Sequence, residues 1–178
     1  FFFKQKTAYE ISTRDWSSDV CSSDLAAGSP DEPAIGAEVE QLIAELTAIR
    51  GNIYWIKEML PHAELISLLS HAETFLCPSI YEPLGIVNLE AMACETAVVA
   101  SKVGGIPEVV VDGETGILVD FSPDHEAFET NFAAAINAVM SDSSLADRYG
   151  KKGRERTIAE FGWDKVAAQT IDLYRSVI

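Results

Sequence analysis

Two glutamates on either side of a glycine form the part of the sequence best suited to bind a ligand. Glu82 and Glu90 enclose seven residues, and Gly85 stands near the start of a helix predicted over about 84–94. The N-terminus of a helix binds phosphate through its unpaired backbone N–H groups and the positive end of its dipole, and glycine leaves that approach open. Glu90 lies among apolar residues, where a carboxylate needs donors such as the vicinal hydroxyls of a ligand.

A purely structural explanation of the same glutamates stays open. Glu82 can stabilise the start of the helix through the dipole, by ~0.3–1 kcal/mol, and Glu90 can face solvent. Spacing alone does not decide between this explanation and a ligand with phosphate and hydroxyl groups.

The elements around this loop alternate between strand and helix. Short, continuously apolar runs predict strands at about 53–56, 74–77, 97–100 and 117–119. Helical spacing predicts helices at about 35–49, from Pro61 to 69, and at 84–94, 123–140, 144–161 and 163–177. This order is typical of an α/β fold with a doubly wound, Rossmann-like parallel sheet covered on both faces. Ligands bind beyond the carboxyl ends of such strands, so the loop at 79–83 is the expected site.

Composition limits the classes of function. The formal net charge of −15 argues against a nucleic-acid partner, which needs a basic face. No apolar run approaches the ~20 residues of a membrane helix. Cys77 and Cys94, without a signal peptide, suggest reduced thiols in a cytoplasm. No G-x-G-x-x-G follows a strand, which argues against a nicotinamide-dependent oxidoreductase. No metal site is indicated, because the three histidines are far apart in sequence: His62, His71 and His125.

Residues 1–25 differ from the rest of the chain. They show neither helical nor strand periodicity, and they resemble the in-frame translation of a sequencing adapter, over Lys4–Ile11 and Asp15–Leu25. A natural disordered tail is the alternative. We therefore expect residues 1–25 to be disordered and their removal to leave the melting temperature unchanged, and we expect the folded domain to cover 26–178.

The stretch from Glu82 to Val119 resembles the retaining GT-B glycosyltransferases. Glu82 and Glu90 form the E-x7-E motif of that family, and EAMACETAVVASKVGGIPEVVVDGETGILV follows from Glu90. The resemblance covers essentially all of 26–178 and implies the C-terminal, nucleotide-sugar-binding half of a two-domain fold, here truncated. Many members of the family have Gly and Pro where Glu95 and Ala97 stand.

A finer resemblance concerns the donor. ACETAVVAS and the earlier EMLP, at 58–61, resemble the actinobacterial glycogen synthase type. That type implies ADP-glucose as the donor and glycogen or maltose 1-phosphate as the product. Another retaining GT-B transferase, with a mannosyl or sucrose-type donor, and a truncated reading frame without function are the alternatives.

The resemblance also implies roles for single residues. Glu82 is the catalytic residue, bonding the donor sugar's hydroxyls near the reacting face, and Glu90 accepts the ribose hydroxyls. The pyrophosphate is held by the backbone of three consecutive residues, Leu84, Gly85 and Ile86. Gly104 and Gly105 supply a tight turn under the sugar, or turn chemistry alone. No cofactor or metal is implied, because the donor's own phosphate serves as the base.

The resemblance places two parts of the enzyme outside this chain. They are the N-terminal domain, which binds the α-glucan or sugar-phosphate acceptor, and a basic Arg/Lys pair that neutralises the leaving pyrophosphate. We therefore expect the isolated chain to be inactive, because electrostatic stabilisation of the leaving group is a dominant catalytic contribution.

Overall fold

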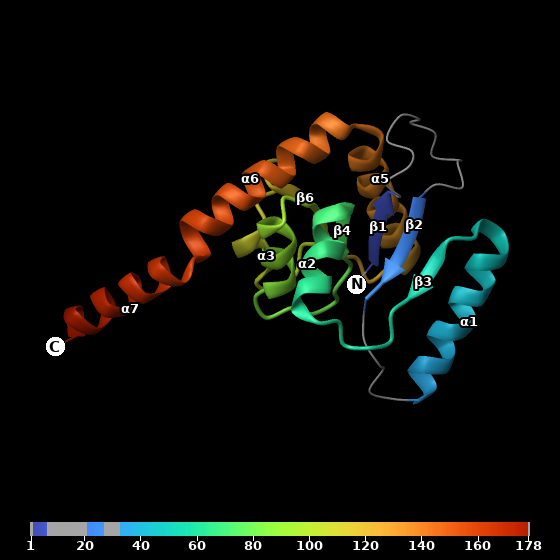
Figure 1. The fold of residues 1–178 in the computed structure, drawn as a ribbon, viewed down its shortest axis with the longest axis horizontal. Coiled ribbons are helices and arrows are strands. Elements are labelled where there is room, and N and C mark those ends of the chain that lie inside the picture. Colours follow the sequence, from blue (N-terminus) through green and yellow to red (C-terminus); the bar gives the residue numbers. More distant parts are fainter. Residues whose placement is uncertain (1, 7–20, 27–32, 178) are drawn as a thin grey trace.

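A computed structural model describes residues 2–6, 21–26 and 33–177 (Figure 1). One six-stranded sheet, in the order β3-β2-β1-β4-β5-β6, forms the centre of the molecule. The elements in chain order are β1 Phe2–Lys6, β2 Cys21–Leu25, α1 Pro33–Arg50, β3 Ile53–Trp55, α2 His62–His71, β4 Ala72–Cys77, α3 Ile86–Ala93, β5 Ala97–Ser101, α4 Ile106–Val109, β6 Gly116–Val119, α5 His125–Ser141, α6 Ser143–Phe161 and α7 Trp163–Val177.

The direction of the strands determines which loops meet. β2 runs parallel to β3, and β4, β5 and β6 run parallel to one another. β1 is antiparallel to both of its neighbours, β2 and β4, so the other five strands share one direction. Their carboxyl ends therefore lie along one edge of the sheet. The loops 56–61, 78–85 and 102–105 leave the sheet at this edge, which we call the loop edge.

Two hydrophobic cores lie on opposite faces of the sheet. Alternate side chains of β4 point to opposite faces: Phe75 and Cys77 pack with α2, α3 and α4, whereas Leu76 packs with α5 and α6. Val98 and Val99 of β5 divide between the faces in the same way. A parallel sheet with both faces covered explains why these strands read as unbroken apolar runs. The predicted doubly wound α/β class is thus confirmed.

Two helices leave apolar side chains exposed. α1 exposes Ile35, Leu42, Leu46 and Ile49, although their helical spacing was the evidence for the helix. α7 extends away from the body of the molecule and buries no residue (Figure 1). Among the residues that the structure describes, no helix combines the length and apolar character needed to cross a membrane.

Two described parts of the N-terminal segment, which was expected to be disordered, form strands. Phe2–Lys6 forms β1 and Cys21–Leu25 forms β2, while residues 7–20 lie outside the described part of the chain. A strand edge presents unpaired N–H and C=O groups that attract another strand. β1 covers the edge of β4 in this way, with Phe2 opposite Leu76. The resemblance of 1–25 to a translated adapter stays a prediction, and so does the disorder expected for 7–20, whereas Phe2–Lys6 and Cys21–Leu25 pair within the sheet.

Deletion of residues 1–25 is accordingly expected to lower the melting temperature of the chain by about 5 °C or more. The deletion unpairs β4 and β3 and removes the buried Leu25. Calorimetry of residues 1–178 and 26–178 in the same buffer measures the difference. An unchanged melting temperature would contradict this pairing and would support a tail that does not pack.

Candidate functional site

The loop between β4 and α3 holds the two glutamates on either side of a helix start. α3 begins at Ile86 rather than at the predicted 84, because Gly85 has a φ of 92°, in the left-handed region. Gly85 donates its backbone N–H to Glu82 Oε1 at 3.1 Å. α3 has no side-chain cap, so a ligand can reach the backbone N–H groups of its first turn.

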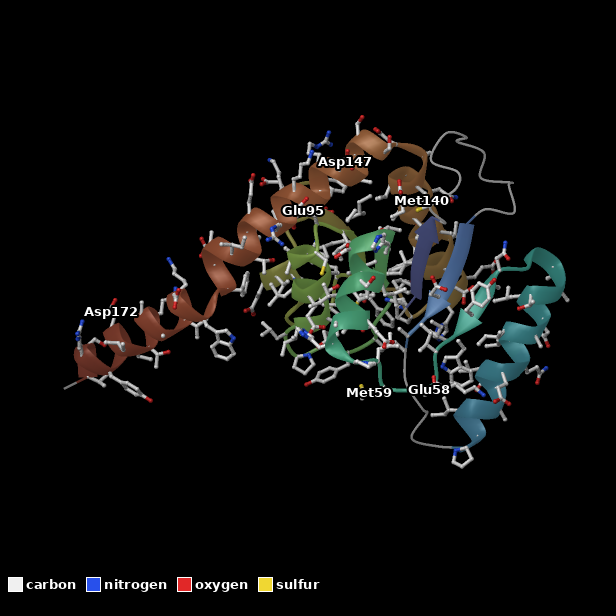
Figure 2. All side chains as sticks on the ribbon, viewed as in Figure 1. Glu58, Met59, Glu95, Met140, Asp147 and Asp172 are labelled. Atoms are coloured by element: carbon white, nitrogen blue, oxygen red, sulfur yellow. The ribbon has the colours of Figure 1, made fainter. Side chains whose placement is uncertain are left out.

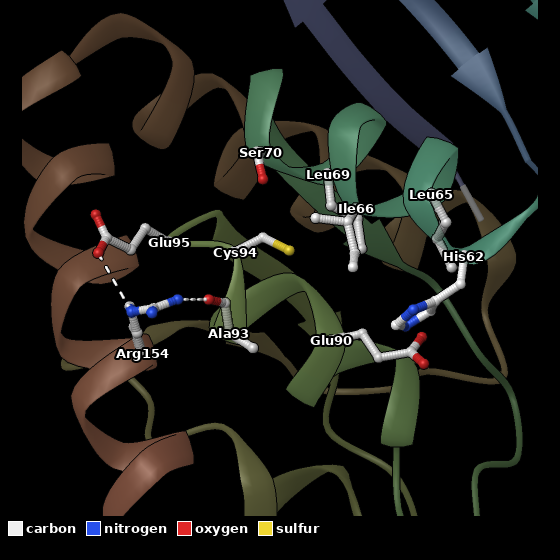
Figure 3. A pocket seen from close by; sticks show the side chains of 10 residues that line it. All are labelled: His62, Leu65, Ile66, Leu69, Ser70, Glu90, Ala93, Cys94, Glu95 and Arg154. Atoms are coloured by element: carbon white, nitrogen blue, oxygen red, sulfur yellow. Dashed lines mark hydrogen bonds and ion pairs between the residues drawn. The ribbon is translucent and has the colours of Figure 1, made fainter.

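Glu90 lies one turn further along α3 and lines a cavity of about 370 Å³ between α2, α3 and α6. Figure 3 shows its carboxylate and the His62 ring pointing toward each other at one end of this cavity. The wall is apolar and comes from α2: Leu65, Ile66 and Leu69. Glu90 is half-buried, so its side chain is not fully exposed to solvent.

An arginine of α6 lines the far end of the cavity. Arg154 donates to the carbonyl oxygen of Ala93 and lies 3.5 Å from Glu95 Oε1 (Figure 3). Neither Glu82 nor the backbone of 84–86 lines this cavity. The structure therefore puts Glu90 in a cavity and Glu82 on the loop edge, with the start of α3 between them.

The predicted glycine pair packs directly against the loop of Glu82. Gly105 donates its N–H to the carbonyl oxygen of Glu82 at 2.9 Å. A Cβ atom at Gly104 would lie 1.9 Å from that same oxygen, and one at Gly105 would lie 2.3 Å from the carbonyl oxygen of Pro83. Real Cβ atoms do not approach so closely, so only glycine allows this backbone contact. The loop 102–105 thus supports the loop of Glu82 from the side of β5.

Sequence reasoning missed two buried polar residues close to this loop. Ser101, at the end of β5, donates to the carbonyl oxygens of Cys77 at 3.3 Å and of Ser79, tying together the ends of two neighbouring strands. Asn88 is wholly buried in α3. For Asn88, the signal available in the sequence was a polar residue inside an otherwise apolar run.

Among the described residues, the lysines near the loop edge are paired with carboxylates. Lys102 Nζ lies 3.5 Å from Asp120, and Lys57 bonds Glu40 and lies 4.6 Å from the centre of the Trp55 ring. Figure 2 shows Glu58 and Met59 on the neighbouring loop between β3 and α2, where Met59 is 90% exposed. Within the described residues, no group of three or more His, Cys, Asp or Glu side chains could hold a metal ion.

Known proteins resemble this chain in both sequence and fold. The family model described as "Glycosyl transferases group 1" matches residues 35–156. An alpha-maltose-1-phosphate synthase from Mycolicibacterium smegmatis is 53% identical over 154 residues, covering 86% of this chain and 40% of that protein. A glycogen synthase from Mycobacterium tuberculosis is 40% identical over 115 residues, covering 65% of this chain and 27% of that protein.

Among solved structures, the sucrose-phosphate synthase from Thermosynechococcus elongatus matches with a TM-score of 0.73 and 36% identity. That match covers 86% of this chain and 38% of the other. The chain thus spans about two fifths of the length of the maltose-1-phosphate synthase that it matches.

Proposed function

The chain belongs to the group 1 glycosyl transferases, and from that premise we propose that it is the donor-binding part of a retaining glucosyltransferase. The whole protein transfers glucose from ADP-glucose to an α-glucan or to glucose 1-phosphate. The identity to a maltose-1-phosphate synthase supports this reaction class. The similarity in fold to a sucrose-phosphate synthase supports a GT-B arrangement, in which this part is the C-terminal half.

The observation that carries the proposal is the placement of Glu82 and Glu90 on either side of the open start of α3. The backbone of Leu84, Gly85 and Ile86 holds the pyrophosphate there. Glu90 lies four residues after Ile86, about 6 Å along the helix axis. The Glu90 carboxylate accepts hydrogen bonds from the ribose hydroxyls at the mouth of the cavity. Glu82, on the loop edge, bonds the hydroxyls of the glucose.

For the transfer reaction, the chain has to position the donor and to stabilise the charge that develops on its sugar. The bond between the anomeric carbon and the donor phosphate breaks, and the acceptor oxygen bonds that carbon on the same face. The acceptor proton passes to the leaving phosphate, which serves as the base, so no metal or other cofactor takes part. Glu82 stabilises the positive charge that develops on the sugar, and such stabilisation acts mainly in the transition state.

The acceptor and the leaving pyrophosphate also need groups outside this chain. In the part of the chain that the structure describes, the two lysines close to the loop edge, Lys57 and Lys102, already pair with carboxylates. We therefore place the cations that neutralise the pyrophosphate, and the acceptor site, in the rest of the whole protein. Residues 1–178 alone then bind the donor without transferring glucose.

A donor comparison tests the proposal. The test uses a chimeric protein, the restored enzyme, in which residues 26–178 of this chain replace the matching segment of the M. smegmatis synthase. The restored enzyme is expected to use ADP-glucose with a kcat/KM at least about tenfold above that for UDP-glucose. One or two hydrogen bonds made to adenine and not to uracil would be enough to give this ratio. Release of ADP and UDP, measured side by side, gives the ratio.

Two controls accompany this measurement: the unaltered synthase, and residues 1–178 alone, which should show no transfer above background. Equal or reversed donor preference would remove ADP-glucose from the proposal and favour another retaining transferase. Transfer by the isolated chain would show that the acceptor site has been placed in the wrong part of the protein.

A further inference from the structure

Asn88 is a buried polar residue whose hydrogen bonds are incomplete. Its side chain is wholly buried in the first turns of α3. Its Nδ2 donates only a long bond of 3.7 Å to Cys77 Sγ, and its Oδ1 has no hydrogen-bond partner among the described residues. A buried carbonyl oxygen without a donor lowers stability, and an apolar side chain of the same shape would avoid that loss.

The surroundings of Asn88 connect it to the candidate site. A Cβ atom at Gly85 would lie 2.8 Å from Asn88 Nδ2 and 3.7 Å from Glu82 Cγ. The Asn88 carboxamide therefore fills the space directly beneath the left-handed turn at Gly85. The backbone N–H of Asn88 also donates to the carbonyl oxygen of Gly85 at 3.0 Å. A shift of this side chain is therefore expected to change the turn at Gly85, which follows Glu82 and precedes α3.

We propose that Asn88 is a positioning residue for the glucosyl transfer: its buried carboxamide supports the Gly85 turn and so aims Glu82 and the first N–H groups of α3 at the donor. The inference rests on the function proposed above. Asn88 itself touches no substrate and acts through Gly85 and Glu82. The unpaired Oδ1 lowers the stability of the fold close to the loop edge, and local costs of this kind commonly accompany function.

Asn88→Leu in the restored enzyme separates a positioning role from a structural one. Leucine has nearly the same shape and removes the unpaired oxygen, so the melting temperature is expected to stay the same or to rise. kcat is nevertheless expected to fall about ten- to a hundredfold, because a small misplacement of a catalytic group has effects of that size. A lower melting temperature with unchanged kcat would assign Asn88 to packing alone and overturn the proposal.

Thr96→Val provides a matched control. Thr96 is also buried, but it lies at the opposite edge of the sheet, where its Oγ1 donates to the carbonyl oxygen of Leu69 at 2.6 Å. Removing this satisfied bond should lower the melting temperature and leave kcat unchanged. Asn88→Leu should also add little to the loss caused by Glu82→Gln, because both act through the same carboxylate. Additive losses would show that Asn88 does not act through Glu82.

Hydrogen exchange in residues 1–178 tests the geometry without any assay of transfer. The N–H groups of Gly85 and Gly105 both bond to Glu82. Asn88→Leu should speed their exchange, whereas Thr96→Val should not. Faster exchange with no transfer by the unaltered restored enzyme would disprove the proposed function and leave the supporting contact in place. Unchanged exchange would overturn the role of Asn88 even if the enzyme is active.

Discussion

Glu82→Gln in the restored enzyme is expected to lower kcat by about a hundred- to a thousandfold, the loss typical of removing one stabilising group from an active site. Glu82 Oε1 accepts the N–H of Gly85, and a glutamine oxygen can accept it too. The substitution therefore removes the charge and leaves the loop in place. The donor KM is expected to change little, because the carboxylate acts mainly on the charge of the transition state.

Glu90→Gln is the matched comparison, since it makes the same change in a residue that lies in the cavity rather than on the loop edge. Loss of a charged hydrogen bond to the ribose should raise the donor KM about ten- to a hundredfold, with a smaller effect on kcat. Steady-state kinetics with varied ADP-glucose separates the two parameters. If Glu82→Gln left turnover intact, the catalytic assignment would be wrong.

Gly104→Ala is expected to disrupt both the fold of the loop edge and the activity. The new Cβ atom would lie 1.9 Å from the carbonyl oxygen of Glu82, which is backbone and cannot rotate away. Gly104 also has a φ of 52°, which strains any other residue. We expect the melting temperature of residues 1–178 to fall by about 10 °C or more. In the restored enzyme, kcat/KM should fall at least about a hundredfold.

Gly113→Ala is the control for backbone strain. Gly113 has a φ of 73°, but a Cβ atom there would meet no heavy atom within 4 Å. This substitution should lower the free energy of unfolding by only ~1–2 kcal/mol, the strain of the left-handed conformation, and should leave activity unchanged. Equal effects of the two substitutions would mean that strain, and not the contact between the loops, explains the loss.

The parts of the fold that depend on local pattern were predictable. The apolar runs at 53–56, 74–77 and 97–100 became β3, β4 and β5. β4 and β5 are apolar because both of their faces are buried, whereas β3 leaves Tyr54 exposed. The short helix α4 was not foreseen. It needs Gly105 and Pro107 at its start and lasts only four residues, too few for a periodic signal.

The strands β1 and β2 were not predictable, because their pairing depends on distant residues. Nothing in Phe2–Lys6 alone indicates a strand, and one of its two partners in the sheet lies about seventy residues away, at Ala72–Leu76. The candidate site also has a part that the sequence predicts and a part that it does not. The spacing of Glu82 and Glu90 was readable from the sequence, whereas the bonds of Asn88 and Ser101 depend on how α3 and β5 each meet Cys77 of β4.

The two cores lie on the faces of the sheet, whereas the residues proposed to bind the donor lie in or after the loops at the loop edge. A change in an exposed loop residue such as Met59 therefore opens no cavity around Val98 or Val99. Over evolutionary time, descendants of one ancestral scaffold can diverge in the sugars or nucleotides that they recognise while inheriting the same interior. In a lineage of such enzymes, substitutions should accumulate sooner in 56–61 than in β5, and new specificities should arise without loss of folding.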